Sequence, residues 1–396
     1  MRQTAQITWL ATGIALAFAF GPVQAQKKDD KAAGDAKQTS VSALVAATDE
    51  AMKAAPGTTV YTVDPAQGAV APDPATQVAM TLSADYLKAT DSKIYAPFTV
   101  TVQPGVLGQG ANFSVYVRLA PQGAQPPAAP PVLDEKARKE KEKQDRRKKK
   151  GKEAQDLTGQ AVSGVEYPWE DYYDLTAVPR GPGGPLTFSR PFSVPGGTYD
   201  AYVAVVSRDP AAAATPAAPA TTPTKIAVHK AQVTVPDYWG PEFQLSSVFV
   251  ANKIAEVATP PTGDEQKQRP YVIGQFEIVP APENKIAGNE ELYVLFFIYG
   301  AQLGEDKKPD VTIEWQPYKK GPLGESQYKA IAPQQLNAQT LPPGFDPAQG
   351  HQLVGSINGI PASALEAGDY RLAIKVTDNK SGKSLTHDVA FTVAGS

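Results

Sequence analysis

The sequence predicts an all-β protein whose main part is two β-sandwiches in tandem, and three observations support this prediction. Short runs rich in aromatic and β-branched residues follow one another from about Thr76 to the C-terminus, which is typical of strands. Several of these runs alternate apolar and polar residues, as strands with one buried face do. A similar order of landmarks occurs on either side of Pro236. With 396 residues, 42% of them hydrophobic, the chain is long enough to form two such cores.

The first 25 residues have the features of a signal peptide. Arg2 supplies a positive charge, residues 7–21 form an apolar run, and the small residues around Ala25 favour cleavage after that residue. The run is short for a membrane span, although a retained membrane anchor is the alternative. We therefore expect an exported protein of the periplasm or cell surface, with no transmembrane span in the mature chain.

Residues 26–75 are predicted to form a flexible N-terminal segment, because charged residues and then Ala and Pro dominate it. A short helix from Ser42 to Ala54, stopped by Pro56 and Gly57, is expected inside this segment. The chain contains no cysteine, which excludes disulfide bonds and thiolate metal sites. Its stability must therefore come from burial and strand pairing.

An internal repeat places the first β-sandwich at residues 76–237 and the second at residues 238–396. Each half contains, in order, two early strands, a strand with one tryptophan, and a closing hairpin that begins with Gly-x-Tyr. These landmarks are Phe98–Val102, Phe113–Leu119, Glu166–Tyr172 and Gly197–Val235 in the first half, and Phe276–Val279, Leu292–Tyr299, Val311–Gln316 and Gly368–Val393 in the second.

The closing strand of the second half shows the alternation most clearly. One set of its side chains is apolar and the other is largely polar, so the strand should bury one face and expose the other. The first set is Tyr370, Leu372, Ile374 and Val376, and the second is Arg371, Ala373 and Lys375.

These landmarks resemble those of immunoglobulin-like and fibronectin-III-like modules of secreted bacterial proteins. In both, a tryptophan lies on a middle strand, and a tyrosine that follows a glycine-bearing turn is similar to the tyrosine corner. The string GDYRLAIKVTDNKSGKSLTHDVAFTV, from Gly368 to Val393, looks like the last two strands of such a module. The resemblance implies a fold and is silent on function, because sandwiches carry many unrelated activities.

Catalytic signatures are absent from the sequence, so we expect no enzyme, no cofactor and no metal site. The three histidines, His229, His351 and His387, are far apart and have no second ligand at metal spacing. The Gly-rich stretch at residues 181–185 lacks the strand-to-helix context of a phosphate loop. Asp378–Gly382 has too few acidic ligands for a calcium loop and is predicted to be a hairpin turn.

An acidic-aromatic run at residues 166–174 allows two interpretations. Trp169 could fill the core of the first sandwich, as Trp315 should fill the second. Alternatively, exposed rings beside carboxylates could stack on sugars, which would make the protein a carbohydrate-binding protein. The candidate sugar contacts are Tyr167, Trp169, Tyr172 and Tyr173.

Two insertions distinguish the first half. The insertion at 121–159 contains a charged stretch, residues 134–153, with eleven basic and six acidic residues; the insertion at 209–223 is almost entirely Ala, Pro and Thr. We expect both to occupy loops at one pole of the sandwich, the B–C and F–G loops, facing away from the second half. The basic side chains could bind an anionic partner, or they could only solubilise the loop. The candidate contacts are Arg146, Arg147, Lys148, Lys149, Lys150 and Lys152.

The sequence therefore favours a non-catalytic interaction or scaffold protein of the bacterial cell envelope. Its partner would be another envelope protein or an anionic envelope polymer; nucleic acid is not expected for an exported chain of net charge −3. The carbohydrate-binding alternative requires an exposed Trp169. An enzyme with an unrecognised site would need a cluster of carboxylates with perturbed pKa values between the two halves.

Overall fold

The computed structural model describes residues 31–64, 69–103, 112–127, 162–163, 165–179, 184–208 and 224–395. The predicted signal peptide, the basic run and the Ala/Pro/Thr-rich insertion lie outside these residues. Strands make up 54% of the described chain and form four sheets, so the all-β prediction is confirmed. The described helical elements are α1 (Lys31–Met52), the short α4 (Asp264–Gln268) and three single 3-10 turns at Pro282–Asn284, Pro347–Gln349 and Ala362–Ala364.

Strands from the first part of the chain form sheets I and II. Sheet I has the order β2-β1-β11-β10-β6-β7; sheet II has the order β3-β5-β9-β8, with β4 also paired to β5. The strands of sheet I are β1 (Gly57–Val63), β2 (Val70–Pro72), β6 (Asn112–Pro121), β7 (Trp169–Thr176), β10 (Gly197–Ser207) and β11 (Thr224–Val235). Those of sheet II are β3 (Met80–Ala84), β4 (Leu87–Lys88), β5 (Ile94–Val102), β8 (Val178–Pro179) and β9 (Leu186–Val194).

Strands after Pro236 form sheets III and IV. Sheet III has the order β12-β17-β13-β15-β14 with β21 paired to β17, and sheet IV has the order β16-β23-β22-β18-β19 with β20 paired to β18. The strands of sheet III are β12 (Gln244–Leu245), β13 (Phe249–Glu256), β14 (Val272–Ile273), β15 (Phe276–Pro280), β17 (Glu291–Tyr299) and β21 (Leu353–Pro361). Those of sheet IV are β16 (Lys285–Ile286), β18 (Val311–Gly321), β19 (Gly324–Gln327), β20 (Ile331–Leu336), β22 (Gly368–Asp378) and β23 (Ser384–Val393).

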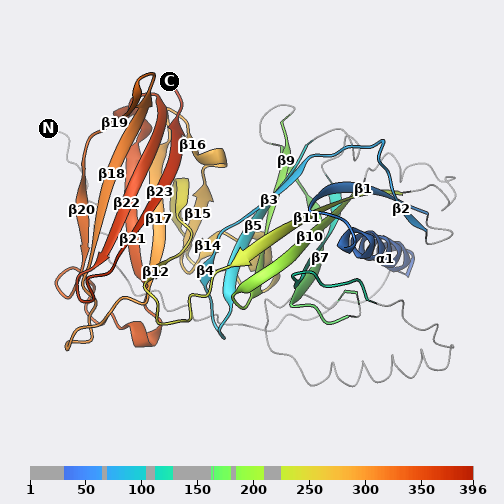
Figure 1. Cartoon of the computed structure of the whole chain (residues 1–396), viewed down its shortest axis with the longest axis horizontal. Coiled ribbons are helices and arrows are strands. Elements are labelled where there is room, and N and C mark those ends of the chain that lie inside the picture. The colour runs from blue at the N-terminus through green and yellow to red at the C-terminus, as the bar shows by residue number, and fades with distance from the viewer. Residues whose placement is uncertain are drawn as a thin grey trace.

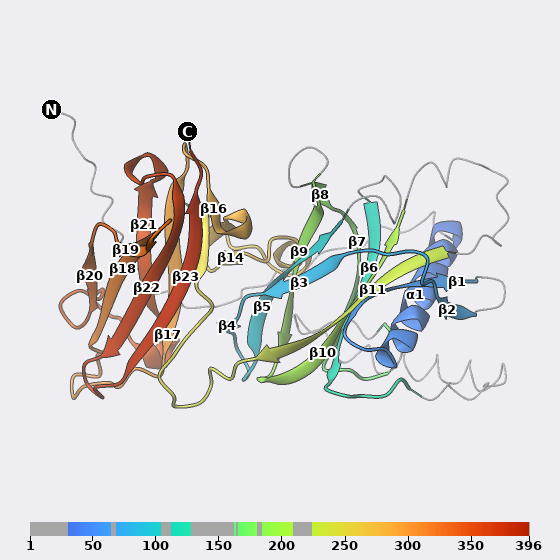
Figure 2. The ribbon, with the colours of Figure 1, turned by 45° about the horizontal axis from the view of Figure 1, so that its top comes forward.

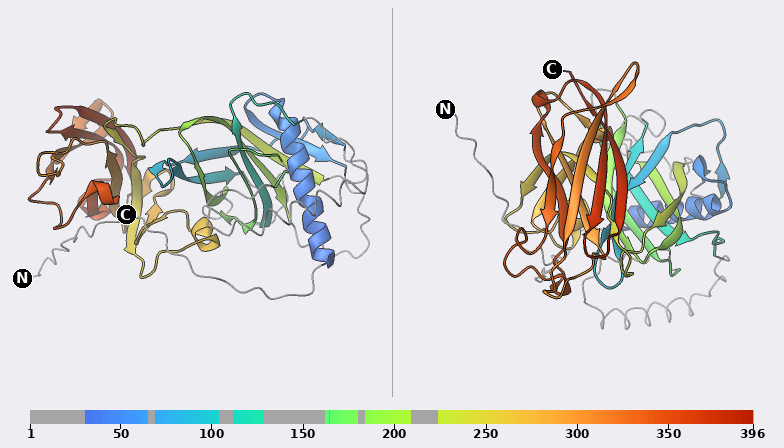
Figure 3. Two further views of the ribbon diagram at one scale, coloured as in Figure 1. Left: turned by 90° about the horizontal axis from the view of Figure 1, so that it is seen from below. Right: turned by 60° about the vertical axis from the view of Figure 1, so that its left-hand side comes forward.

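The four sheets and α1 form successive layers, from sheet IV at one end to α1 at the other (Figure 1). Figure 2 shows the same layers from a second direction, and in Figure 3 α1 crosses the outer side of sheet I. Three apolar clusters join the layers. One lies between α1 and sheet I, a second runs from sheet I through sheet II into sheet III, and a third lies between sheets III and IV. This arrangement is consistent with a β-sandwich architecture.

Sheet II lies between sheets I and III, and its central strand β5 is largely buried. On β5, Phe98 and Val100 are fully buried in the large cluster, while Tyr95 is 9% exposed and its hydroxyl donates to the carbonyl of Pro270, 2.8 Å away, beside sheet III. On β17, Phe296 packs toward sheet IV, and its neighbour Phe297 belongs to the cluster shared with sheet II. The two halves of the chain therefore share an apolar contact.

The N-terminal segment differs from the prediction of a flexible region. Helix α1 is longer than the expected Ser42–Ala54 helix, and β1 pairs antiparallel with β11 along its whole length. Leu44 and Ala47 on α1 are fully buried against sheet I. This sheet face carries Tyr116, Tyr202 and other large apolar groups, and α1 removes them from water.

The predicted correspondence of the early strands was wrong by one strand. Phe113–Leu119 lies on β6, which pairs with the closing strand β10 in sheet I. Its predicted counterpart, Leu292–Tyr299, lies on β17 in sheet III, whereas the closing strand β22 belongs to sheet IV. Strand β18 pairs with β22 in the same way that β6 pairs with β10, so β18 is the counterpart of β6. Trp169, on β7, and Trp315, on β18, therefore occupy different positions in the pairing order, although both are buried.

The two insertions were expected to leave the sandwich from one pole, but they leave from opposite poles. Strand β6 ends at Pro121, opposite Tyr199 at the start of β10, whereas β10 ends at Ser207, opposite Phe113. The basic insertion thus follows a strand end at one pole and the Ala/Pro/Thr-rich insertion follows a strand end at the other. The end of β11 at Val235 lies beside Gly197, at the same pole as Pro121. The basic insertion therefore begins at the end from which the chain continues to sheet III, contrary to the prediction.

Each closing strand begins with the same local bond. The hydroxyl of Tyr199 donates to the carbonyl of Pro195 at 2.9 Å, and that of Tyr370 donates to the carbonyl of Glu366 at 2.7 Å. Two residues before each tyrosine stands a glycine with positive φ, +155° at Gly197 and +140° at Gly368. A side chain is strained in this backbone region, and this explains the Gly-x-Tyr pattern in both places.

Candidate functional site

A row of polar side chains crosses sheet I beneath α1. Arg118 on β6 lies directly opposite Glu170 on β7 and Tyr202 on β10, and Tyr202 lies opposite Lys230 on β11. Because directly opposed side chains point to the same face, all four are on the side that α1 covers. Arg118 and Tyr202 are fully buried there.

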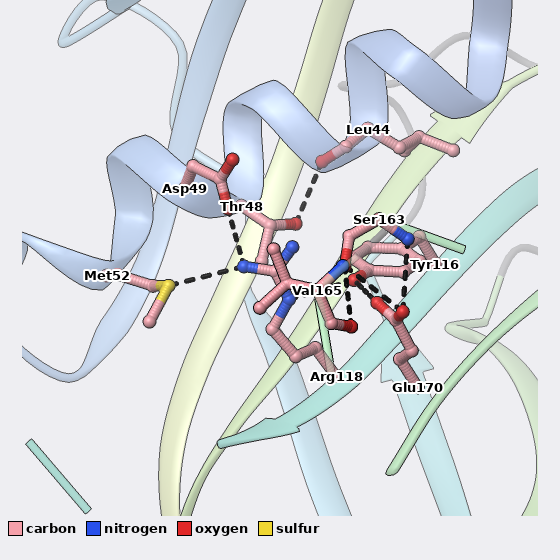
Figure 4. A network of polar contacts seen from close by, with 9 residues as sticks. All are labelled: Leu44, Thr48, Asp49, Met52, Tyr116, Arg118, Ser163, Val165 and Glu170. Carbon is pink, nitrogen blue, oxygen red and sulfur yellow. Dashed lines mark hydrogen bonds and ion pairs between the residues drawn. The ribbon is translucent and has the colours of Figure 1, made fainter. Parts of the chain in front are cut away.

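Arg118 joins α1 to the sheet (Figure 4). Its Nη1 donates to Asp49 Oδ1 on α1 at 2.6 Å and lies 3.2 Å from Met52 Sδ. Its Nε donates to the hydroxyl of Tyr116 at 2.8 Å, and the ring of Tyr167 covers the guanidinium, 4.2 Å from its Cζ. Burial opposes the charge of Arg118, but Tyr116 and Asp49 outweigh this effect and raise its pKa.

Glu170 completes the network on the other side of Tyr116. Its Oε1 accepts from the backbone amides of Val162 and Ser163, at 2.7 and 3.0 Å, and from the Ser163 hydroxyl at 3.1 Å. Its Oε2 accepts from the Tyr116 hydroxyl. Burial is the main reason why the pKa of Tyr116 is far above its ordinary value. Tyr116 therefore stays protonated and links the carboxylate to the guanidinium.

The end of α1 is held by a second cation. Lys230 Nζ donates to the carbonyls of Met52 and Ala54, at 3.1 and 2.8 Å, and a cation at the C-terminus of a helix is stabilising. Two basic residues, Arg118 and Lys230, and two acidic residues, Asp49 and Glu170, therefore lie between α1 and sheet I. The contacts of Arg118 and Lys230 with α1 hold the helix on sheet I.

Three buried polar atoms in this row have no hydrogen-bond partner among the described residues. They are Arg118 Nη2 and the hydroxyls of Tyr167 and Tyr202. Sequence reasoning missed Arg118 and Asp49 altogether. An arginine within the apolar run Phe113–Leu119 was the available signal, since a charge in a buried strand requires a partner.

A second polar network lies where sheets II and III meet. The Tyr271 hydroxyl, just before β14, donates to Asp85 Oδ2 at 3.2 Å and lies 3.3 Å from Thr99 Oγ1 on β5. Burial raises the pKa of Asp85 to about 6, and the bond from Tyr271 opposes this shift. Close by, Lys267 on α4 pairs with Asp171 on β7 at 2.9 Å. This ion pair joins α4 in the second half of the chain to β7 in the first half.

The four candidate sugar-contact residues do not form one surface. Trp169 is 2% exposed and packs on Phe192, with ring centroids 6.1 Å apart, and Tyr173 on the same side of β7 is also buried. Tyr172 points to the opposite side, where its hydroxyl donates to Asp174 at 2.7 Å, and Tyr167 covers Arg118. The ring of Trp169 is therefore not accessible for stacking on a sugar, because it fills the core.

The other sequence candidates are scattered or lie beyond the described residues. The whole basic run, from Arg146 to Lys152, is outside them. His229 Nδ1 lies 2.9 Å from Thr58 Oγ1, His351 accepts from the backbone of Asp346 at 2.9 Å, and His387 is exposed on β23. Within the described ranges, His, Asp and Glu side chains form no group of three that could hold a metal ion.

No helix in the part of the chain that the structure describes is long and apolar enough to cross a membrane. No family model matches this chain, and no curated protein matches it.

Proposed function

We propose that this protein is an exported, non-catalytic interaction or scaffold protein of the bacterial cell envelope, built from two immunoglobulin-like sandwiches. The pairing orders support the fold assignment. The order β11-β10-β6-β7 beside β3-β5-β9 in the first half matches β23-β22-β18-β19 beside β13-β17-β21 in the second. The two tyrosine bonds at the starts of β10 and β22 are the corner expected of that fold.

The contact between sheets II and III is the observation that carries the scaffold proposal. Large apolar contacts between domains limit their relative motion. Here the shared cluster is reinforced by hydrogen bonds that cross from one half to the other, such as Tyr86 N to Ser247 Oγ at 2.8 Å and Tyr95 OH to Pro270 O at 2.8 Å. A stack held in this way keeps its two ends at a constant separation, which is the mechanical property a scaffold needs.

The two ends of the stack differ in what they offer to a partner. Sheet I is covered by α1, whereas the outer side of sheet IV carries polar side chains joined by ion pairs, with Lys375 at 2.8 Å from Glu314 and Arg371 at 3.0 Å from Asp388. Polar sheet faces of this kind stay in water without cover. We place partner contacts on this face and on the basic run Arg146–Lys150.

Export is tested by fractionating the producing bacterium. A C-terminally tagged full-length chain should be recovered from the envelope fraction with Gln26 as its first residue, as determined by mass spectrometry. A variant lacking residues 2–25 should stay in the cytoplasm. Recovery of the full-length chain in the cytoplasm with its first 25 residues intact would contradict the proposal.

The anionic-partner proposal is tested with a charge-matched pair of variants. One replaces Arg146–Lys150, five basic residues, by serine; the control replaces Lys136, Arg138, Lys139, Lys141 and Lys143 by serine. Both lose the same charge, so only a specific contact distinguishes them. The first variant should lose retention on isolated envelopes at low salt. Equal retention of both variants and the unmodified chain would show that the run only solubilises the loop.

A further inference from the structure

Asp85 occupies an unusual position for a carboxylate. It lies at the corner between β3 and β4, where its backbone amide donates to the carbonyl of Pro97 at 2.9 Å. Its side chain is directed to the junction with sheet III, where the Tyr271 hydroxyl donates to Oδ2 at 3.2 Å. Asp85 is half-buried, and a carboxylate withdrawn from water in this way normally has a cation or several donors. For Asp85, the hydroxyl of Tyr271 is the one described side chain that favours its ionised form.

The contacts beside Asp85 hold the two halves together. Tyr86 and Ser247 form a reciprocal pair, since Tyr86 N donates to Ser247 Oγ at 2.8 Å and Ser247 N donates to Tyr86 O at 3.1 Å. Three residues after Asp85, the amide of Lys88 donates to the hydroxyl of Tyr299 at 3.1 Å. A change at Asp85 therefore acts on the contact surface of sheets II and III and not on an exposed loop.

The titratable groups that face Asp85 are phenols. Tyr86 comes from its own corner, Tyr238 from the connection between the halves, and Tyr271 from the segment before β14. Burial raises the pKa of Tyr86 and Tyr238, so both phenols stay neutral in acidic and neutral solution. Lys88, three residues after Asp85, has its ammonium over the ring of Trp239, 4.2 Å from the ring centroid. The charge of Asp85 is therefore opposed mainly by burial.

We propose that Asp85 makes the junction of sheets II and III a pH-responsive contact, which is tightest when Asp85 carries a proton and weaker when it is ionised. Protonation requires only a proton from solvent, and the neutral carboxyl can still accept from Tyr271. This proposal is independent of the function proposed above and concerns the cohesion of the stack itself.

The sign follows from proton linkage. Burial raises the pKa of Asp85 from 3.8 to about 6, so between these values the folded chain binds a proton that the unfolded chain does not. Stability then increases as the pH falls through 6 toward 4, and is lost as the pH rises through 6. A shift of about two pKa units corresponds to roughly a hundredfold change in the unfolding equilibrium constant over this range.

Urea unfolding of the mature chain at pH values from 4.5 to 7.5 tests the proposal with three variants. Asp85→Asn mimics the protonated group, so its profile should be flatter than that of the unmodified chain, and at pH 7.5 it should be the more stable protein. Tyr271→Phe removes the opposing hydrogen bond and should move the pH transition upward. Asp264→Asn changes an exposed carboxylate at the start of α4 and serves as the control.

Hydrogen exchange measured on residues 82–90 and 245–250 locates the effect at the junction. Protection of both segments should decrease as the pH rises through 6 in the unmodified chain, after correction for intrinsic exchange, and should not change in Asp85→Asn. An Asp85→Asn profile as steep as that of the unmodified chain overturns the proposal. If Asp85→Asn does not fold, a Tyr271→Phe transition at an unchanged pH overturns it.

Discussion

Lys267 on α4 places its ammonium 2.9 Å from the carboxylate of Asp171 on β7, and the two residues come from opposite halves of the chain. Asp171 is 3% exposed at its side chain and Lys267 is 16% exposed. The pair therefore links the short helix between β13 and β14 to the edge strand of sheet I, through a region from which water is largely excluded. Removing one partner of such a pair leaves a buried charge without compensation.

Lys267→Ala should destabilise the folded chain by about 3 kcal/mol, because Asp171 then keeps a buried charge without its ion-pair partner. Urea unfolding followed by tryptophan fluorescence measures this change. Lys285→Ala is the matched control, because Lys285 pairs with Glu283 on the surface, with side chains 61% and 59% exposed; its effect should stay below about 1 kcal/mol. Equal effects of the two substitutions would show that the junction pair adds nothing beyond a surface pair.

Asp49→Ala should loosen α1 from sheet I. Arg118 would lose its charged partner on the helix, and a hydrogen bond between charged groups contributes about 2 kcal/mol. The expected result is faster amide exchange along α1 together with a lower unfolding midpoint in urea. Glu50→Ala on the same helix removes a surface pair with Lys53, 40% exposed at Glu50, and should leave exchange nearly unchanged. Equally fast exchange in α1 in both variants would show that the bond between Arg118 and Asp49 does not hold α1 on sheet I.

Tyr199→Phe and Tyr370→Phe should each cost about 1 kcal/mol of unfolding free energy, since each removes one hydrogen bond to a backbone carbonyl. The two costs should be similar, because each hydroxyl binds the carbonyl four residues before it. Tyr293→Phe is the control, as its hydroxyl binds Glu291 at the surface. A cost confined to one of the two corners would argue against equivalent roles for β10 and β22.

His229 should act in the direction opposite to Asp85. Burial lowers the pKa of His229 from 6.5, so below pH 6.5 the unfolded chain takes up a proton that the folded chain does not. This contribution to stability is present above pH 6.5 and is lost as the pH falls. His229→Gln should therefore lose less stability than the unmodified chain between pH 7 and 5, as measured by urea midpoints. His387→Gln, on an exposed strand position, is the control; a profile of His229→Gln identical to that of the control would contradict the prediction.

Local patterns predicted the closing strands of both halves well. The buried set Tyr370, Leu372, Ile374 and Val376 matches the alternation in the sequence, and Trp169 and Trp315 are both buried. The turn at Asp378–Gly382 is a hairpin connection between β22 and β23. The weakly apolar strands β19 and β20 could not be placed, because β19 is exposed along its length and has no alternation to recognise.

The candidate site was harder to predict. Arg118 and Asp49 are 69 residues apart and Lys267 and Asp171 are 96 apart, so no spacing in the sequence relates them. The acidic-aromatic run was singled out as one surface, yet β7 is a strand, and its alternation divides the run between two faces. Glu170 takes part in the buried network because it points to the same side as Arg118, while Trp169 points into the core.

The sequence by itself determined the all-β class, the strand character of the closing hairpins and the burial of their apolar sets, because alternation is a local property with a period of two residues. Tertiary structure alone decided which sheet each early strand joins, how α1 covers sheet I, and how sheets II and III meet. These features depend on pairing and packing between residues far apart in the chain, and a carboxylate such as Asp85 becomes half-buried only when two such sheets meet beside it.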